Sequence, residues 1–177
     1  MKLSFRSVLL LSGLAMTAAS YAQSSMDTGV SAGLYLPSDG AVRNAFGSSI
    51  FRFGFGQVGS QRTGNFKIGT ELDFITANKN GNRLFIVPFT LTAEQQLAFS
   101  GGTRPYIKPF AGLAYMDYSV GIPGGRSESK VIRFTYGVEG GVVVSDHLRL
   151  SARYNVFPKT GGFDFSGLTV MATFSLR

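Results

Sequence analysis

The chain has 177 residues, with 17 Lys and Arg against 10 Asp and Glu, which gives a formal net charge of +7. It has no cysteine, which excludes a disulfide framework, thiolate metal ligands and a thiol nucleophile. The positive excess is modest and contains no run of Lys or Arg, so binding to nucleic acid is not expected. Charged residues make up only 15% of the chain, whereas 23 Gly and 16 Phe are high for a soluble domain.

The first residues have the pattern of a secretory signal peptide. Two basic residues precede the apolar run Val8–Met16, and the small residues Ser20 and Ala22 fit the −3 and −1 positions of a cleavage site. The apolar run is too short to cross a membrane as a helix. We therefore expect residues 1–22 to be removed on export and residues 23–177 to form one domain. An uncleaved N-terminal helix is the alternative.

The remainder of the chain alternates between apolar and polar residues with a period of two, which is the pattern of β-strands. In chain order the alternation predicts eight strands, at residues 30–36, 51–56, 66–74, 84–96, 107–115, 132–144, 148–156 and 167–176. At roughly ten residues, these strands are longer than the ~5–6 typical of soluble proteins and match the ~9–11 of a tilted strand that crosses a membrane.

The segments between the strands are rich in turn-forming residues. Turns or loops are expected at 37–40, 60–65, 78–82, 100–103, 121–130, 145–147 and 158–162. Ala41–Phe46 is predicted to form one helical turn in the first loop. Pro88 lies inside the fourth strand, where it cannot donate a ladder hydrogen bond, so a bulge or a local irregularity is expected there.

The two faces of the predicted strands differ sharply. One face is apolar on nearly every strand, and the other carries Gly, Ser and Thr together with ten charged side chains: Arg52, Lys67, Glu71, Asp73, Glu94, Lys108, Arg133, Glu139, Arg149 and Arg153. A secreted lipocalin-like carrier would turn the apolar face inward and hold an apolar ligand there. The glycines favour the opposite arrangement, because they leave room for Arg and Lys inside a narrow barrel whose apolar face meets lipid.

Several segments resemble a known family. Arg104–Ile107 leading into Phe110–Tyr115 is similar to the fifth strand of small bacterial outer-membrane barrels, and Gly137–Gly141, Leu148–Tyr154 and Val170–Phe174 resemble their last strands. The resemblance is to the eight-stranded group that includes the OmpA transmembrane domain and OmpW, and it covers essentially the whole mature chain. It implies an all-β fold, an eight-stranded antiparallel up-and-down transmembrane β-barrel in the cell outer membrane, with both termini on the periplasmic side.

The ten charged residues are the candidate functional residues. The interior of an eight-stranded barrel is just wide enough for side chains to fill it, and a buried charge without a partner is costly. We therefore expect these residues to pair in a lumen charge network that plugs the barrel and gives it a structural role; a narrow ion pore is the alternative. An OmpW-like channel for small apolar solutes would instead need an apolar lumen, which the inner-face residues Leu84, Ile86, Phe110, Met116 and Met171 could contribute.

The sequence gives no indication of an enzyme or of a cofactor or metal site. The sole histidine, His147, adjoins Asp146 in a short turn, and no serine is placed to complete a catalytic relay. The expected partners are outer-membrane lipids and the machinery that inserts outer-membrane proteins. The oligomeric state does not follow from the sequence, and a monomer is the simplest expectation.

Overall fold

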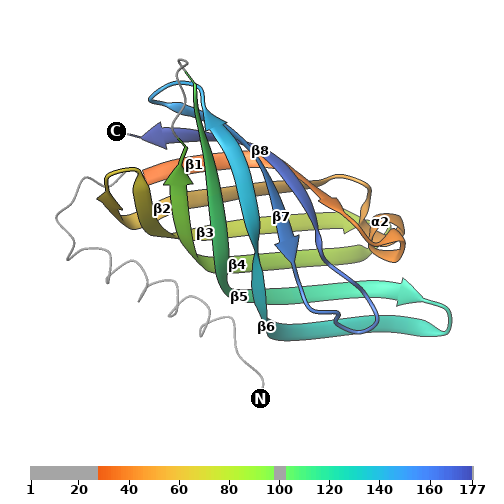
Figure 1. Ribbon diagram of the computed structural model, residues 1–177. Helices are drawn as coiled ribbons and strands as arrows, with labels where there is room; N and C mark the ends of the chain where they lie inside the picture. Colours follow the sequence, from red (N-terminus) through yellow and green to blue (C-terminus); the bar gives the residue numbers. More distant parts are fainter. Residues whose placement is uncertain (1–27, 98–102, 177) are drawn as a thin grey trace.

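The computed structural model describes residues 28–97 and 103–176, so the predicted signal peptide lies outside the described residues. The elements are β1 (Thr28–Pro37), α2 (Gly40–Phe46), β2 (Ile50–Thr63), β3 (Phe66–Lys79), β4 (Asn82–Gln96), β5 (Arg104–Ile122), β6 (Gly125–Val143), β7 (Leu148–Val156) and β8 (Gly167–Leu176). Each strand pairs antiparallel with the next, and β8 pairs with β1 to close a barrel (Figure 1). The predicted eight-stranded antiparallel up-and-down barrel is confirmed.

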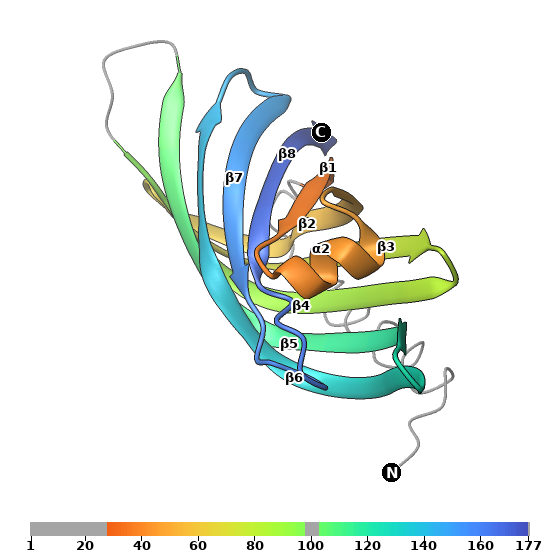
Figure 2. The same ribbon diagram turned by 90° about the vertical axis from the view of Figure 1, so that its right-hand side faces the viewer.

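The predicted helical turn forms α2, which lies across one end of the barrel (Figure 2). Asp39 caps it, since its Oδ1 accepts hydrogen bonds from the backbone N–H of Ala41 at 2.6 Å and of Val42 at 3.2 Å. Desolvation acts to raise the pKa of the Asp39 carboxyl, but these hydrogen bonds outweigh it and hold the pKa below its ordinary value. Gly47 follows the helix with φ 112°, a conformation that favours glycine. Within the described residues no helix is long and apolar enough to cross a membrane.

Two local predictions differ from the structure, and a third is met in one of its two forms. Residues 121–130 are not a loop: β5 and β6 pair as far as Ile122 and Gly125, and only Pro123–Gly124 turn the chain. Residues 60–65 are not all turn either, because β2 continues to Thr63 and follows β3 through two register shifts. At Pro88 the expected local irregularity is present, because the β3–β4 ladder is interrupted there, but there is no bulge, since the register of β4 is the same on both sides of it.

The apolar face of the barrel points outward. The large apolar side chains that are more than a third exposed come from every strand and include Leu34, Phe51, Phe55, Ile68, Phe89, Leu91, Leu113, Ile132, Phe134, Val138, Leu150, Val170 and Phe174. The charged face points inward, where Arg52, Glu71, Asp73 and Arg153 are buried. This orientation is the reverse of a lipocalin-like carrier, so that alternative is not observed.

The interior has two layers. At the α2 end lies an apolar cluster, formed by inner-face residues of the strands, by α2 and by the β7–β8 connection: Tyr35, Val42, Ala45, Phe46, Ile50, Ile75, Leu84, Ile86, Ala114, Met116, Tyr118, Val120, Phe157 and Phe165. Toward the opposite end, where β1 begins and β8 ends, the inner face becomes charged. The change is visible along β3, whose buried inner residues run from Lys67 through Glu71 and Asp73 to Ile75.

Candidate functional site

The charged layer of the interior is the candidate functional site. Antiparallel pairing places its members at similar heights on neighbouring strands: Arg52 lies on β2, Glu71 and Asp73 on β3, Lys108 on β5, Glu139 on β6 and Arg153 on β7. Lys108 and Glu139 are direct partners in the β5–β6 ladder, and Glu139 is also the direct partner of Arg153 in the β6–β7 ladder. Side chains opposite each other in a ladder point to the same face, so strand register brings the charges together.

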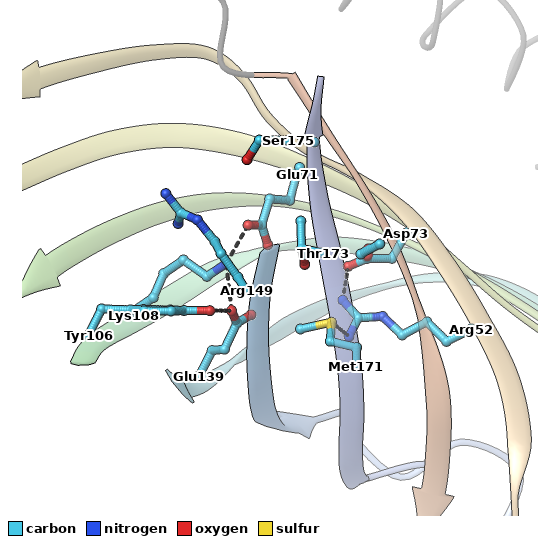
Figure 3. Close-up of a pocket in the computed structure, with 13 residues that line it drawn as sticks. Arg52, Glu71, Asp73, Tyr106, Lys108, Glu139, Arg149, Met171, Thr173 and Ser175 are labelled. Atoms are coloured by element: carbon cyan, nitrogen blue, oxygen red, sulfur yellow. Dashed lines mark hydrogen bonds and ion pairs between the residues drawn. The ribbon is translucent and has the colours of Figure 1, made fainter. Parts of the chain in front are cut away.

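These side chains form a continuous chain of ion pairs across the barrel. Figure 3 shows two parts of it, the Arg52–Asp73 pair and the contacts of Lys108 with Glu71 and Glu139. Arg52 Nη2 lies 2.6 Å from Asp73 Oδ2, and Arg153 Nη1 lies 2.6 Å from Glu71 Oε2 and 3.5 Å from Asp73 Oδ2. Lys108 Nζ connects Glu71 Oε1 at 2.6 Å with Glu139 Oε1 at 2.9 Å. Because all six side chains are at most 6% exposed, each charge depends on the others for its stability.

Arg153 is the centre of this cluster. Its side chain is fully buried, and its guanidinium is close to three carboxylates, including Glu139 Oε2 at 3.8 Å. Arg153 Nη2 also donates a hydrogen bond to Thr90 Oγ1 at 3.3 Å, and the guanidinium carbon lies 3.5 Å from the ring centroid of Phe110. A guanidinium suits this position because it stacks on an aromatic ring while its edge reaches several acceptors.

A second group lies nearer the end of the barrel where β1 begins and β8 ends. Arg149 Nη1 lies 2.7 Å from Glu94 Oε2, and Glu94 is the direct ladder partner of buried Lys67. Tyr106 joins the two groups, because its hydroxyl donates to Glu139 Oε1 at 2.7 Å while the Arg149 guanidinium lies 5.6 Å from its ring centroid. Arg149 is the least buried of these cations, with 15% of its side chain exposed.

Glycines on the inner face provide the space that the long charged side chains occupy. A Cβ atom at Gly54 would collide with the Asp73 carboxylate, and one at Gly137 would collide with the Tyr154 backbone and come within 2.6 Å of the Phe110 ring that supports Arg153. By contrast, a Cβ atom at Gly140, on the outer face of the same strand, would meet nothing within 4 Å. The charged side chains can therefore pack as they do only because these inner-face positions have no side chain.

The charged layer leaves little open space. The cavity beside it, lined by Arg52, Glu71, Asp73, Lys108 and Glu139 among others, has a volume of about 30 Å³. A water molecule needs roughly 10–15 Å³ by the same measure, so the cavity suits two or three waters. Among the described residues, Glu139 Oε2 accepts no hydrogen bond, and Asp73 Oδ2 is contacted through its ion pairs with Arg52 and Arg153, so these oxygens make the cavity a polar site for such waters.

Nine of the ten sequence-predicted residues lie in this interior: Arg52, Lys67, Glu71, Asp73, Glu94, Lys108, Glu139, Arg149 and Arg153. Arg133 does not join them. It is on the inner face of β6, opposite Ala114, but its side chain is exposed, and it takes part in none of the ion pairs found within the described residues. The reason is geometric: β7 ends at Val156, opposite Tyr136, so no strand encloses β6 at the level of Arg133.

Three residues of the site were not among the predicted network. Tyr106, Phe110 and Thr90 contact the charged side chains directly. The signal for Tyr106 and Phe110 was the period of two, because both share the inner face of β5 with Lys108. Their rings carry no charge, so neither residue was among the charged side chains of the predicted network.

Outside the charged layer, the described residues offer few side chains that could take part in catalysis or metal binding. His147 is exposed in the β6–β7 turn, and its neighbour Asp146 pairs instead with Arg104 at 3.0 Å. The described part of the chain contains no group of three or more His, Cys, Asp or Glu side chains that could hold a metal ion.

Comparisons with known proteins agree with this fold. No protein-family model matches the chain, and no curated protein matches its sequence. Among solved structures, Neisserial surface protein A (NspA) is similar with a TM-score of 0.57 and 17% identity, over 84% of this chain and 96% of that one. The N-terminal β-barrel domain of Pseudomonas aeruginosa OprF is similar with a TM-score of 0.54 and 12% identity, over 85% of this chain and 98% of that one. Both are eight-stranded outer-membrane barrels, so the predicted resemblance in fold is confirmed.

Proposed function

We propose that this chain is an outer-membrane β-barrel protein whose lumen is plugged by its own side chains, and that its role in the membrane is structural. The observation that carries the proposal is the buried chain of ion pairs centred on Arg153, beside which the cavity measures only about 30 Å³. A barrel built to conduct would keep its inner charges apart and hydrated. Here opposite charges contact each other across the barrel axis.

The outer surface supports a membrane location. The outward side chains of β6 are apolar or small from Ile132 to Val142, and charged residues begin at Lys130. Ten residues of strand span about 33 Å, or about 25 Å along a barrel axis from which the strands tilt by roughly 40°. That height matches the apolar band of about 25 Å on outer-membrane barrels. The predicted signal peptide, removal of which would leave the barrel free for insertion, fits the same location.

In this proposal the barrel is inserted by the outer-membrane machinery, is surrounded by lipid and is oriented with both termini in the periplasm. The α2 end then faces the cell exterior, and α2 with the β7–β8 connection covers the apolar cluster there. The two layers of the plug differ in their chemistry. A hydrated ion would have to separate the ion pairs of the charged layer, and any solute would have to displace the packed side chains of the apolar layer.

Recording from planar bilayers tests the plug. Purified, refolded protein is expected to give no steady conductance above the background of the bilayer, and a known porin added to the same chamber serves as the positive control. The variant Arg149→Ser enlarges only the end of the lumen near the termini, so it is also expected to remain silent. Steady conductance steps from the unmodified protein would favour the narrow ion pore instead. Uptake of small apolar solutes by proteoliposomes, without conductance, would favour the OmpW-like channel.

A further inference from the structure

Part of one edge of β6 has no partner strand among the residues that the structure describes. β6 pairs with β5 along its whole length, from Gly125 to Val143, but β7 reaches only as far as Tyr136. On the β7 side, the segment from Gly125 to Thr135 therefore runs beyond its neighbour by about 36 Å, at about 3.3 Å per residue. In Figure 1 the β5–β6 hairpin extends past the end of β7.

The direction of the free backbone groups follows from the ladder. Val144 N–H donates to the Leu148 carbonyl at 2.9 Å, so the even-numbered residues of β6 turn their backbone groups toward β7. In an antiparallel sheet alternate residues bond to opposite neighbours, and the register with β5 is unbroken to the hairpin turn. The N–H and C=O groups of Arg126, Glu128 and Lys130 therefore point to the open side.

No other segment that the structure describes bonds to these groups. Within the described residues, none of the backbone hydrogen bonds made by turns and loops reaches Gly125–Thr135. The β7–β8 connection approaches the hairpin from the barrel side, where the Tyr118 hydroxyl donates to the Thr160 carbonyl at 3.2 Å. A Cβ atom at Gly161 would lie 3.5 Å from Ser127 Oγ, which places this part of the connection against the inner face of the hairpin. None of the backbone hydrogen bonds that the connection makes among the described residues reaches the free edge.

This edge contains neither proline nor a bulge, and its protection against pairing with an uncharged strand comes from its charged side chains alone. Its charge is positive on balance: Arg126, Lys130 and exposed Arg133 outnumber Glu128 on β6 and Asp117 on β5. Arg126 Nε lies 3.5 Å from Glu128 Oε1 and Lys130 Nζ lies 3.4 Å from Asp117 Oδ2, whereas Arg133 is in none of the ion pairs found within the described residues. Lys159 is exposed on the nearby connection. An unpaired edge combined with positive charge is complementary to an extended polypeptide that carries acidic side chains.

We propose that the free edge of β6 binds an acidic polypeptide segment from another protein by strand addition. The added strand runs antiparallel to β6 and continues the line of β7 above the apolar band. Backbone hydrogen bonds to Arg126, Glu128 and Lys130 give the affinity, and the surrounding cations select for acidic side chains. The site is separate from the plugged lumen, so it does not depend on whether the barrel conducts.

The test uses the refolded barrel in detergent micelles and a fluorescein-labelled peptide of ten residues that alternates Val and Glu, with binding followed by anisotropy. The matched variants are Glu128→Pro and Glu128→Ala. Both remove the same carboxylate, but only proline removes the backbone N–H at the open edge, and the β5 ladder does not use that N–H. We expect Glu128→Ala to bind at least as tightly as the unmodified protein and Glu128→Pro to bind at least tenfold more weakly. Both variants should still migrate as folded barrels on an unheated SDS gel.

Two further measurements separate strand addition from simple charge attraction. The same peptide with alternate backbone nitrogens methylated keeps every charge but cannot pair with an edge, and we expect it not to bind. Arg133→Gln should weaken binding of the unmethylated peptide severalfold. Equal binding by Glu128→Pro and Glu128→Ala, equal binding of the methylated peptide, or no peptide binding while dextran sulfate binds would each overturn the proposal.

Discussion

Removal of the Arg153 guanidinium is the sharpest test of the charged cluster. Arg153→Met keeps a long apolar side chain against the Phe110 ring but removes the charge that lies 2.6 Å from Glu71 and 3.5 Å from Asp73. Arg52 and Lys108 then remain in contact with three buried carboxylates. Removing one partner from a buried pair typically costs about 3–5 kcal/mol, because a charge is left without compensation. We expect the free energy of unfolding to fall by about that amount.

The assay is urea unfolding in detergent micelles, followed by far-UV circular dichroism, since the chain has no tryptophan for fluorescence. Arg104→Met is the control, because its pair with Asp146 is solvent-exposed and should contribute about 1 kcal/mol or less. The double variant Arg153→Met/Glu71→Gln restores the charge balance, so it should lose less stability than the two single changes added together. If Arg153→Met cost no more than Arg104→Met, the cluster would not stabilise the barrel in the way the ion-pair geometry implies.

Three other changes test separate parts of the fold. Gly137→Ala should destabilise the barrel by about 1–3 kcal/mol because its Cβ meets the Tyr154 backbone, whereas Gly140→Ala on the same strand should be neutral; urea midpoints measure both. Asp39→Ala should cost about 1 kcal/mol through loss of the α2 cap. The pKa of Asp39 is lower in the folded than in the unfolded protein, so the cap stabilises the fold fully above the ordinary pKa of about 4. This stabilisation is lost as the pH falls through the folded pKa. The difference in free energy of unfolding between the unmodified protein and Asp39→Ala should therefore become smaller in acid. Phe165→Ala, at a fully buried ring in the apolar layer, should cost about 3–5 kcal/mol and make the β7–β8 connection more sensitive to protease; an unchanged cleavage rate would argue against its role in covering the lumen.

The alternation of side chains was enough to predict the strands and their faces. A period of two is a local property, so each strand could be identified without knowledge of its neighbours. Strand length was less predictable, and the hairpin at residues 121–130 shows why. Gly121, Gly124 and Gly125 favour a loop on composition, yet ladder partners on β5 extend the strand to Gly125. The length over which a strand pairs depends on its neighbours in the sheet, so it cannot be predicted from the residues of that strand alone.

The charged site was predictable in composition but not in its arrangement. The inner face of each strand identified the charged residues, while the pairing of particular side chains depended on register and on the barrel shear. Arg133 illustrates the limit: its position on the strand matches the inner face, but the end of β7 leaves it outside the enclosed lumen. The separation into two layers was present in the sequence, since Leu84, Ile86 and Met116 interrupt the polar face near the α2 end.

A gel of the isolated outer-membrane fraction tests the central proposal most directly. The sample is divided, and only one half is boiled in SDS before loading. A closed barrel in the outer membrane should be recovered in this fraction and migrate at a different apparent mass when unheated, because SDS does not open the barrel in the cold. Recovery of the protein in the soluble fraction, or in the membrane with identical mobility before and after boiling, would contradict a closed barrel that spans the outer membrane.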